Sequence, residues 1–258
     1  MTGELNEAMD AEFDTVAEWT ALVAADLGPD YYIPAACRGS GQPEVLDWLL
    51  ARLAPRPGQL LIDVGAGLGG PAAYAARHAR VRPVLAEPEP DACRAAARLF
   101  GFPVFQADAT KLPFGDAVTD LVWCLGVLCT APGTEAQRAM LRELRRVIRP
   151  GGRIGLLVFL AETAELHDPP QGNHFPSSSL LHDLFGQARL EPVDVADFHG
   201  RAAAPPDWAD RAAAVEHELH RRYGHTAELA SADDQSGRIG RLLASGELTA
   251  QVILLRAA

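Results

Sequence analysis

The feature that most constrains the fold is a short apolar run that leads into a cluster of glycines and then into an alanine-rich segment. These three parts occupy residues 60–64, 65–70 and 71–80. Their order predicts a buried strand, a tight turn and a helix. Glycine permits positive φ and close backbone approach, and the first amides of the helix point at whatever lies over the turn. The sequence therefore predicts a nucleotide-like ligand at the end of this strand.

Strands and helices are expected to alternate along the rest of the chain. Thr134 and Gln137 have the spacing of a capping box, which predicts the start of a helix that continues to Ile148. Alternation of this kind predicts an α/β fold with a doubly wound, mostly parallel, seven-stranded Rossmann-like sheet, right-handed crossovers and a helical cap. A helix is also expected at 90–100, and the remaining strands at 84–87, 104–108, 120–126, 153–160, 190–197 and 249–256.

The flanking segments supply the expected cap. Residues 1–30 carry apolar side chains at helical spacing, residues 31–41 are expected to form a loop, and Pro43 suits the first turn of a helix. A length of 258 residues suits one continuous α/β domain. Within it we expect an N-terminal helical lid, a ligand-binding core and C-terminal strands with helical substrate-binding insertions, which occupy residues 1–45, 46–160 and 161–258.

Charge and composition exclude several classes of partner. Asp and Glu total 34 against 23 Lys and Arg, and the net charge of -11 opposes binding to nucleic acid. No apolar run approaches the roughly 20 residues of a membrane-spanning helix, so we expect a cytoplasmic protein without a membrane partner. The four cysteines form no CxxC pair, and neither a disulfide nor a bound metal is expected.

Three carboxylates follow successive expected strands. Asp63 lies two residues before the first glycine of the turn, where it can attract an ammonium group. Glu87 lies 24 residues further on, near the spacing at which a carboxylate accepts hydrogen bonds from ribose hydroxyls. Asp108 ends the third expected strand and is placed to accept from an exocyclic amine. Gly65, Gly67 and Gly70 also satisfy the dinucleotide pattern G-x-G-x-x-G, so the turn alone leaves the ligand open.

Four segments together resemble the class I S-adenosylmethionine-dependent methyltransferases, especially the type 11 group that acts on small molecules. They read LLIDVGAGLGG, LAEPEP, QADATKLPFGDAVTDLVWCLGVL and LRELRRVIRPGGRIGLLVF. The resemblance implies S-adenosylmethionine as cofactor and a sheet of order 3-2-1-4-5-7-6. It also implies one role for each part of the site: Asp63 with Gly65, Gly67 and Gly69 for the methionine part, Glu87 for the ribose, and Asp108 with Ala109 for the adenine.

Further candidate residues lie outside these motifs. Tyr32 and Arg38 are expected to contact the cofactor from a lid that closes over it. Cys124 is also a candidate cofactor contact, although its apolar surroundings favour core packing. His174, in a loop after the fifth strand, is the candidate catalytic base or orienting residue, with capping or solvent exposure as the alternative. His217 and His220 lack the HExxH spacing, because Arg221 occupies the second histidine position.

The resulting hypothesis is an enzyme that methylates a small organic metabolite, possibly in specialised biosynthesis. The fourth strand ends in Trp123-Cys124-Leu125-Gly126, without the Asn-Pro-Pro-Tyr or Asp-Pro-Pro-Tyr tetrapeptide of amino-methylating DNA enzymes. Two alternatives stay open at this point: a cofactor-binding protein that catalyses a cyclisation or rearrangement, and a dinucleotide oxidoreductase. The substrate, the methylated atom and the oligomeric state are not determined by the sequence.

Overall fold

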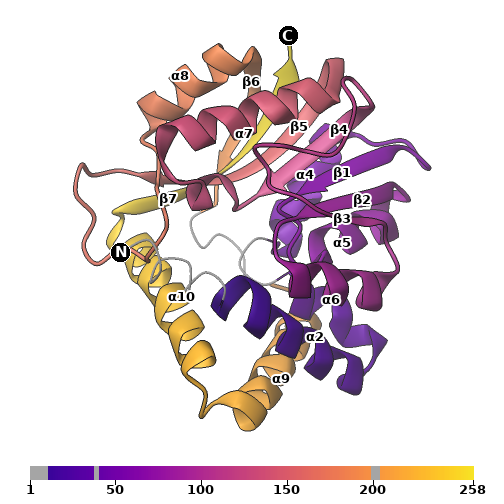
Figure 1. Cartoon of the computed structure of the whole chain (residues 1–258), viewed down its shortest axis with the longest axis vertical. Coiled ribbons are helices and arrows are strands. Elements are labelled where there is room, and N and C mark those ends of the chain that lie inside the picture. The colour runs from indigo at the N-terminus through magenta and orange to yellow at the C-terminus, as the bar shows by residue number, and fades with distance from the viewer. Residues whose placement is uncertain (1–10, 38–40, 199–203) are drawn as a thin grey trace.

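A seven-stranded sheet of order β3-β2-β1-β4-β5-β7-β6 forms the centre of the protein (Figure 1). The computed structural model describes residues 11–37, 41–198 and 204–258. All neighbouring strands are parallel except β7, which pairs antiparallel with both β5 and β6. Both the expected fold class and the expected strand order are confirmed. The strands are β1 Leu60–Val64, β2 Arg82–Glu87, β3 Val104–Gln106, β4 Thr119–Leu125, β5 Ile148–Ala161, β6 Leu190–Asp197 and β7 Leu248–Ala257.

Helices cover both faces of the sheet. One face packs against α4 (Pro43–Leu53), α5 (Gly70–Ala79) and α6 (Pro90–Phe100), and the other against α7 (Gly133–Val147) and α8 (Ser178–Ala188). Strand β4 shows why both faces are apolar. Its alternate residues Leu121, Trp123 and Leu125 join the cluster beneath α4 and α5, while Val122 and Cys124 join the cluster beneath α7. The sheet is therefore buried as a middle layer.

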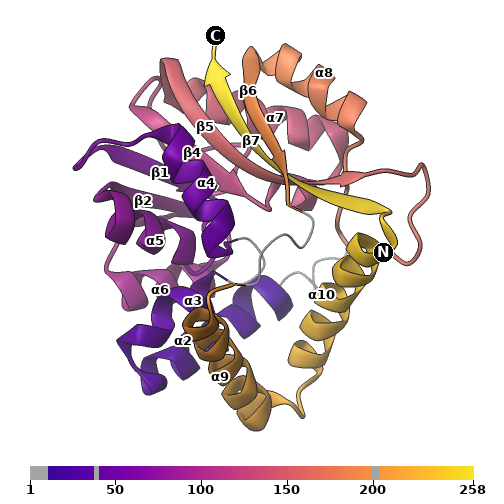
Figure 2. The ribbon, with the colours of Figure 1, turned by 180° about the vertical axis from the view of Figure 1, so that it is seen from behind.

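A cap of helices lies beyond the end of the sheet at which the parallel strands terminate (Figures 1 and 2). Trp19 and Tyr223 stack there with ring centroids 4.3 Å apart, which joins the N-terminal helix to a helix nearly 200 residues later in the chain. The expected apolar stripe on that later helix is confirmed, because Val215 and Leu219 are buried against Val16 and Val23. The cap consists of η1 (Ala11–Thr15), α2 (Val16–Leu27), η2 (Pro29–Tyr31), α3 (Tyr32–Ala36), α9 (Pro206–Tyr223) and α10 (Ala227–Ser245).

Two local expectations are wrong. Residues 31–41 are not a loop throughout, because α3 occupies Tyr32–Ala36. Pro34 lies in the first turn of that helix, where its missing N–H would have no intrahelical partner in any case. The capping box at Thr134 and Gln137 is also absent: α7 begins at Gly133, and the buried Gln137 side chain instead donates to the carbonyls of Leu128 and His174.

No helix within the described residues has the length and hydropathy needed to cross a membrane.

Candidate active site

The glycine turn after β1 presents one open position. Gly65, Gly67 and Gly69 all have positive φ, which favours glycine. A Cβ atom at Gly65 would overlap Val127, and one at Gly69 would overlap Leu85. At Gly67, by contrast, a Cβ atom would meet nothing within 4 Å. The side of the turn above Gly67 is therefore the side on which a ligand can approach the backbone.

Glu87 connects the end of β2 to this turn. Its Oε2 accepts a hydrogen bond from the Gly67 amide at 2.7 Å, and its Oε1 accepts one from the Glu89 amide at 3.2 Å. The residue is only 5% exposed, and burial raises its pKa to about 7 against the lowering effect of the two amides. Nearby Glu89 and Asp14 raise the pKa further. The carboxylate thus lies beside Gly67, in a position suited to hydroxyl donors over the turn.

Asp63 is a buried carboxylate with an unused acceptor. It is 2% exposed, and within the described part of the chain its Oδ2 has no hydrogen-bond partner. Burial raises its pKa to about 7, an effect that Trp123 partly offsets and Glu87 increases. The Trp123 indole N–H lies near but does not complete a hydrogen bond. An anion in this position requires a cation or a proton, because an isolated buried charge is strongly unfavourable.

The adenine-side candidates lie just beyond β3. Oδ1 of Asp108 accepts hydrogen bonds from the amide and the hydroxyl of Thr110, both at 2.6 Å. This local turn ends β3 at Gln106, two residues before the expected end. Asp108 is exposed, whereas Ala109 is buried in the core beneath α7. The backbone at Ala109 is thereby fixed while the carboxylate beside it faces solvent.

The lid segment, defined here as residues 31–41, docks onto the start of α5. A Cβ atom at Gly70 would overlap the backbone of Ala36 and Cys37, so the two segments touch without an intervening side chain. Tyr32 packs edge-on against Phe100, with ring centroids 6.2 Å apart. Arg38, the other expected lid contact, lies outside the described residues. The structure thus brings the lid and the glycine turn together.

Replacing Gly70 with alanine should separate the lid from the turn. The added methyl group would overlap the Ala36 backbone, so we expect faster amide exchange at residues 31–37 and no protection there when S-adenosylhomocysteine is added. In the wild type, exchange across this segment should fall on ligand addition. Gly186→Ala is the matched control, because a Cβ atom at that helical glycine meets nothing within 4 Å. Unchanged wild-type exchange would contradict a closing lid.

Two other candidates have different surroundings. His174 is exposed, and its backbone is held on both sides: its amide donates to the Cys129 carbonyl at 2.6 Å, and its carbonyl accepts from Gln137 at 2.6 Å. Cys129 belongs to η3 (Leu128–Thr130), which follows β4, so the loop with His174 lies at the ligand side of the sheet. Cys124 is 1% exposed in the core, and burial raises the pKa of its thiol.

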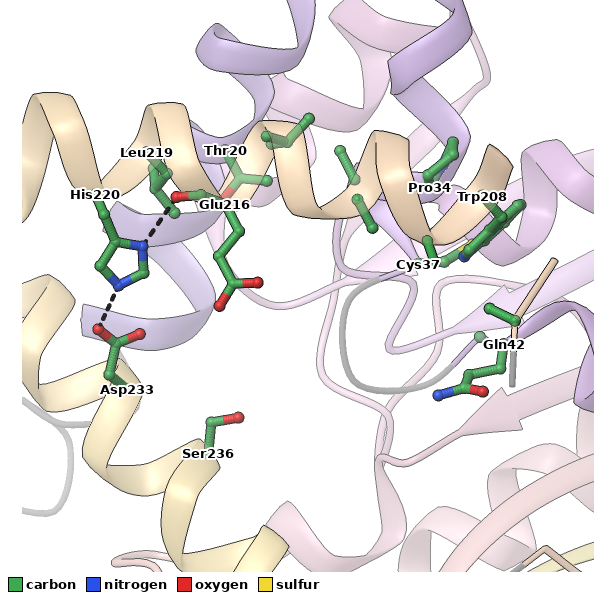
Figure 3. A pocket seen from close by; sticks show the side chains of 16 residues that line it. Thr20, Pro34, Cys37, Gln42, Trp208, Glu216, Leu219, His220, Asp233 and Ser236 are labelled. Atoms are coloured by element: carbon green, nitrogen blue, oxygen red, sulfur yellow. Dashed lines mark hydrogen bonds and ion pairs between the residues drawn. The ribbon is translucent and has the colours of Figure 1, made fainter. Parts of the chain in front are cut away.

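A cavity of about 580 Å³ opens between the cap helices (Figure 3). The sequence gave no sign of it, since its walls come from α2, α3, α9, α10 and the start of α4. His220 and Asp233 face each other at one end, with Nε2 and Oδ2 2.8 Å apart. The lining residues are Thr20, Pro34, Ala35, Cys37, Gly41, Gln42, Ala204, Trp208, Ala209, Ala212, Val215, Glu216, Leu219, His220, Asp233 and Ser236.

The ligand-free protein should lose stability as pH rises from 5 to 8. Asp63 and Glu87 have folded-state pKa values of about 7, above their ordinary values of 3.8 and 4.5. In this pH window the unfolded chain binds fewer protons than the folded chain, so the free energy of unfolding falls, on the order of 2 to 5 kcal/mol. Urea denaturation at the two pH values measures it. Constant stability, or an equal fall in Asp63→Asn, would contradict this origin.

Comparisons with known proteins match the same part of the chain. The family model described as "Methyltransferase domain" matches residues 62–156, which run from β1 to β5 and include the glycine turn, Glu87 and Asp108. Residues 62–156 are a class I S-adenosylmethionine-dependent methyltransferase domain. The dinucleotide oxidoreductase alternative is therefore wrong. Within the methyltransferase domain, Asp63 stands where the sequence departs from a dinucleotide-binding strand.

Two relatives are methyltransferases by name. The domain is 32% identical over 115 residues to methyltransferase GfsG of Streptomyces halstedii, across 42% of this chain and 40% of that protein. It is 36% identical over 121 residues to the 27-O-demethylrifamycin SV methyltransferase of Amycolatopsis mediterranei (strain S699), across 44% and 43%. The matched parts thus span less than half of each relative's length.

Solved structures share the methyltransferase fold over more of the chain. The cyclopropane synthase MmaA2 of Mycobacterium tuberculosis superposes with a TM-score of 0.67 at 14% identity, covering 92% of this chain and 97% of that one. The [4+2]-cyclase SpnF superposes with a TM-score of 0.63 at 24% identity, covering 83% and 80%. At these identities the likeness concerns the fold alone.

Proposed function

We propose that this protein binds S-adenosylmethionine over the glycine turn and transfers its methyl group to a small organic acceptor. The observation that carries the proposal is the buried Asp63 carboxylate, whose Oδ2 lacks a partner among the described residues. An α-ammonium group is the cation that this cofactor would place beside the end of β1. The unused acceptor and the open position above Gly67 fit such a ligand.

Each proposed contact has its own chemical task. Asp63 pairs with the ammonium group, and Gly65, Gly67 and Gly69 let the backbone approach the methionine part. Glu87 accepts from the ribose hydroxyls, while Asp108 and Ala109 border the adenine. When bound, the cofactor supplies an activated methyl group on a sulfonium sulfur. The lid segment, including Tyr32 and Arg38, excludes water and holds the reactants in line.

A small-molecule acceptor from natural-product metabolism is supported by the relatives. One of them is named for 27-O-demethylrifamycin SV, and another, O-methyltransferase cnsE of Penicillium expansum, is 30% identical over 164 residues. The net charge of -11 also disfavours a nucleic-acid substrate. We therefore extend the proposal to specialised biosynthesis, with the acceptor atom left open.

Calorimetric titration with S-adenosylhomocysteine and with NAD tests cofactor binding directly. We expect binding of the first and none of the second, and failure of the first would overturn the proposal. Turnover is tested by incubating the protein and S-adenosylmethionine with candidate acceptors and measuring release of S-adenosylhomocysteine. A product formed without that release would instead support the cyclisation or rearrangement alternative, for which SpnF shows that the fold is used by a protein named as a cyclase.

His174→Ala should lower kcat by about 10²–10⁴-fold if His174 is the base that removes a proton from the acceptor. The proposal rests on its place at the ligand side of the sheet, where two backbone hydrogen bonds position the residue. The affinity for S-adenosylhomocysteine should stay unchanged. His182→Ala, which alters an exposed histidine on α8, is the control. A loss below about tenfold for His174→Ala would assign the residue to the loop structure only.

A further inference from the structure

The cap cavity has two chemically different ends (Figure 3). Pro34, Cys37, Gln42 and Trp208 lie at one end, and Glu216, His220, Asp233 and Ser236 lie at the other. Trp208 and His220 are twelve positions apart on α9, which corresponds to about 18 Å along the helix axis. The cavity is therefore elongated, and a molecule that fills it is longer than a single ring.

The Trp208 end adjoins the proposed cofactor site. Cys37 lines the cavity there and is close enough to Asp63 for that carboxylate to add to the effect of burial, which raises the pKa of the Cys37 thiol. Gly41, also in the lining, lies against Pro71 at the start of α5. An acceptor bound in the cavity would thus have one end beside the glycine turn.

The walls between the two ends are mostly apolar. Pro34, Ala35, Val215 and Leu219 are buried side chains of α3 and α9 that line the cavity, and Ala212 adds a small, partly buried side chain between them. Apolar walls bind the hydrocarbon part of a ligand by removing it from water. They leave recognition of polar groups to the ends of the cavity.

At the far end, His220 already has a partner on each ring nitrogen. Nδ1 lies 2.9 Å from the Glu216 backbone carbonyl and Nε2 lies 2.8 Å from Asp233 Oδ2. A carbonyl can only accept, so Nδ1 donates to it, and Nε2 must also carry a proton to bond the Asp233 carboxylate. The backbone carbonyl and Asp233 accordingly raise the pKa of His220 above its ordinary value. The imidazolium compensates the charge of Asp233.

Glu216 is left with an uncompensated charge. Its side chain extends from α9 into the cavity, and within the described residues its carboxylate has no ion pair or hydrogen bond (Figure 3). The adjacent basic residues of α9 are already engaged, since Arg221 and Arg222 both pair with Glu218. The far end of the cavity therefore carries a net negative charge supplied by one side chain.

We propose that the cap cavity binds the methyl acceptor lengthwise and that Glu216 binds a basic amine at the end of the acceptor remote from the methylated atom. This inference rests on the proposed methyl transfer and adds a substrate class to it: elongated, largely apolar molecules with an ammonium group. His220 and Asp233 are positioning residues, because their pairing joins α9 to α10 across this end of the cavity.

Matched ten-carbon probes test the charge preference in the full-length protein. Decylamine, decanol and decanoate are titrated by calorimetry at pH 7.5 below their aggregation concentrations. We expect decylamine to bind about fivefold more tightly than decanol, and decanoate to bind most weakly, since a solvent-accessible ion pair contributes up to about fivefold. Equal affinities for the three probes, or no binding of any probe, would overturn the proposal.

Three variants locate the binding and separate this inference from the proposed function. Glu216→Gln should remove the preference for decylamine, whereas Asp210→Asn, which removes one exposed charge from the same helix outside the cavity, should keep it. Ala212→Trp should fill the cavity and weaken all three probes at least about tenfold. Equal behaviour of Glu216→Gln and Asp210→Asn would overturn the assignment of Glu216. S-adenosylhomocysteine binding is measured in parallel, and its loss in the wild type would count against the proposed function alone.

Discussion

Replacing Gly67 with valine should abolish measurable binding of S-adenosylhomocysteine, a loss of at least about 100-fold in affinity. Gly67 has a φ of +51°, which a β-branched residue strongly resists. A side chain here would also extend into the open space above the turn, where we propose that the cofactor binds. The Glu87 carboxylate, which accepts from the Gly67 amide at 2.7 Å, would shift with the backbone. Titration calorimetry measures the effect.

Gly58→Val separates backbone strain from loss of the site. Gly58 also has positive φ and open space at its Cβ position, but it lies in the turn before β1, at the opposite end of that strand. Both variants should melt at a lower temperature than the wild type, and only Gly67→Val should lose the ligand. If the two variants bind equally well, the space above Gly67 is not the cofactor site.

Asp63→Asn should have opposite effects on stability and on binding. At pH 8 the buried carboxylate costs the ligand-free protein on the order of 4 kcal/mol, given its raised pKa of about 7. A neutral amide removes most of this cost but adds that of its own unsatisfied groups, so we expect a net gain of about 2 kcal/mol. Loss of a charge-assisted contact to the ammonium group should weaken S-adenosylhomocysteine by about tenfold or more.

The control for Asp63→Asn is Asp120→Asn. Asp120 is a partly exposed carboxylate near the start of β4 that pairs with Arg149, so it lies at the end of the sheet away from the turn. It should change neither the affinity nor the stability by more than about 1 kcal/mol. A variant Asp63→Asn that is less stable at pH 8 and binds normally would show that the carboxylate is satisfied by the protein itself.

Local patterns were enough to predict the core of the fold. Strands β1 and β6 and helices α4 and α6 have the bounds expected from the sequence, because buried parallel strands are short apolar runs and prolines mark the first turns of these helices. The prediction was wrong where a local signal had two meanings. Gln137 has the right spacing for a capping box, yet its amide serves Leu128 and His174 across a long-range contact.

The candidate site divides in the same way. Asp63, Glu87 and Asp108 were found from the sequence because the ends of neighbouring parallel strands meet at one edge of a sheet, so spacing alone brings them together. The sequence by itself therefore determined the glycine turn, the strand order implied by the resemblance and the cofactor class. The pairing of His220 with Asp233 was missed, since the two residues lie on different helices whose packing no local pattern reports.

What only the tertiary structure decided is the environment of these residues. Burial, and not residue type, leaves Asp63 with a high pKa and an unused acceptor. Contact between the lid segment and Gly70 depends on the docking of α3 against α5, and the cap cavity depends on α3, α9 and α10 meeting beyond the sheet. Such contacts join segments up to about 200 residues apart, and they arise because apolar faces distant in sequence must be buried against one another.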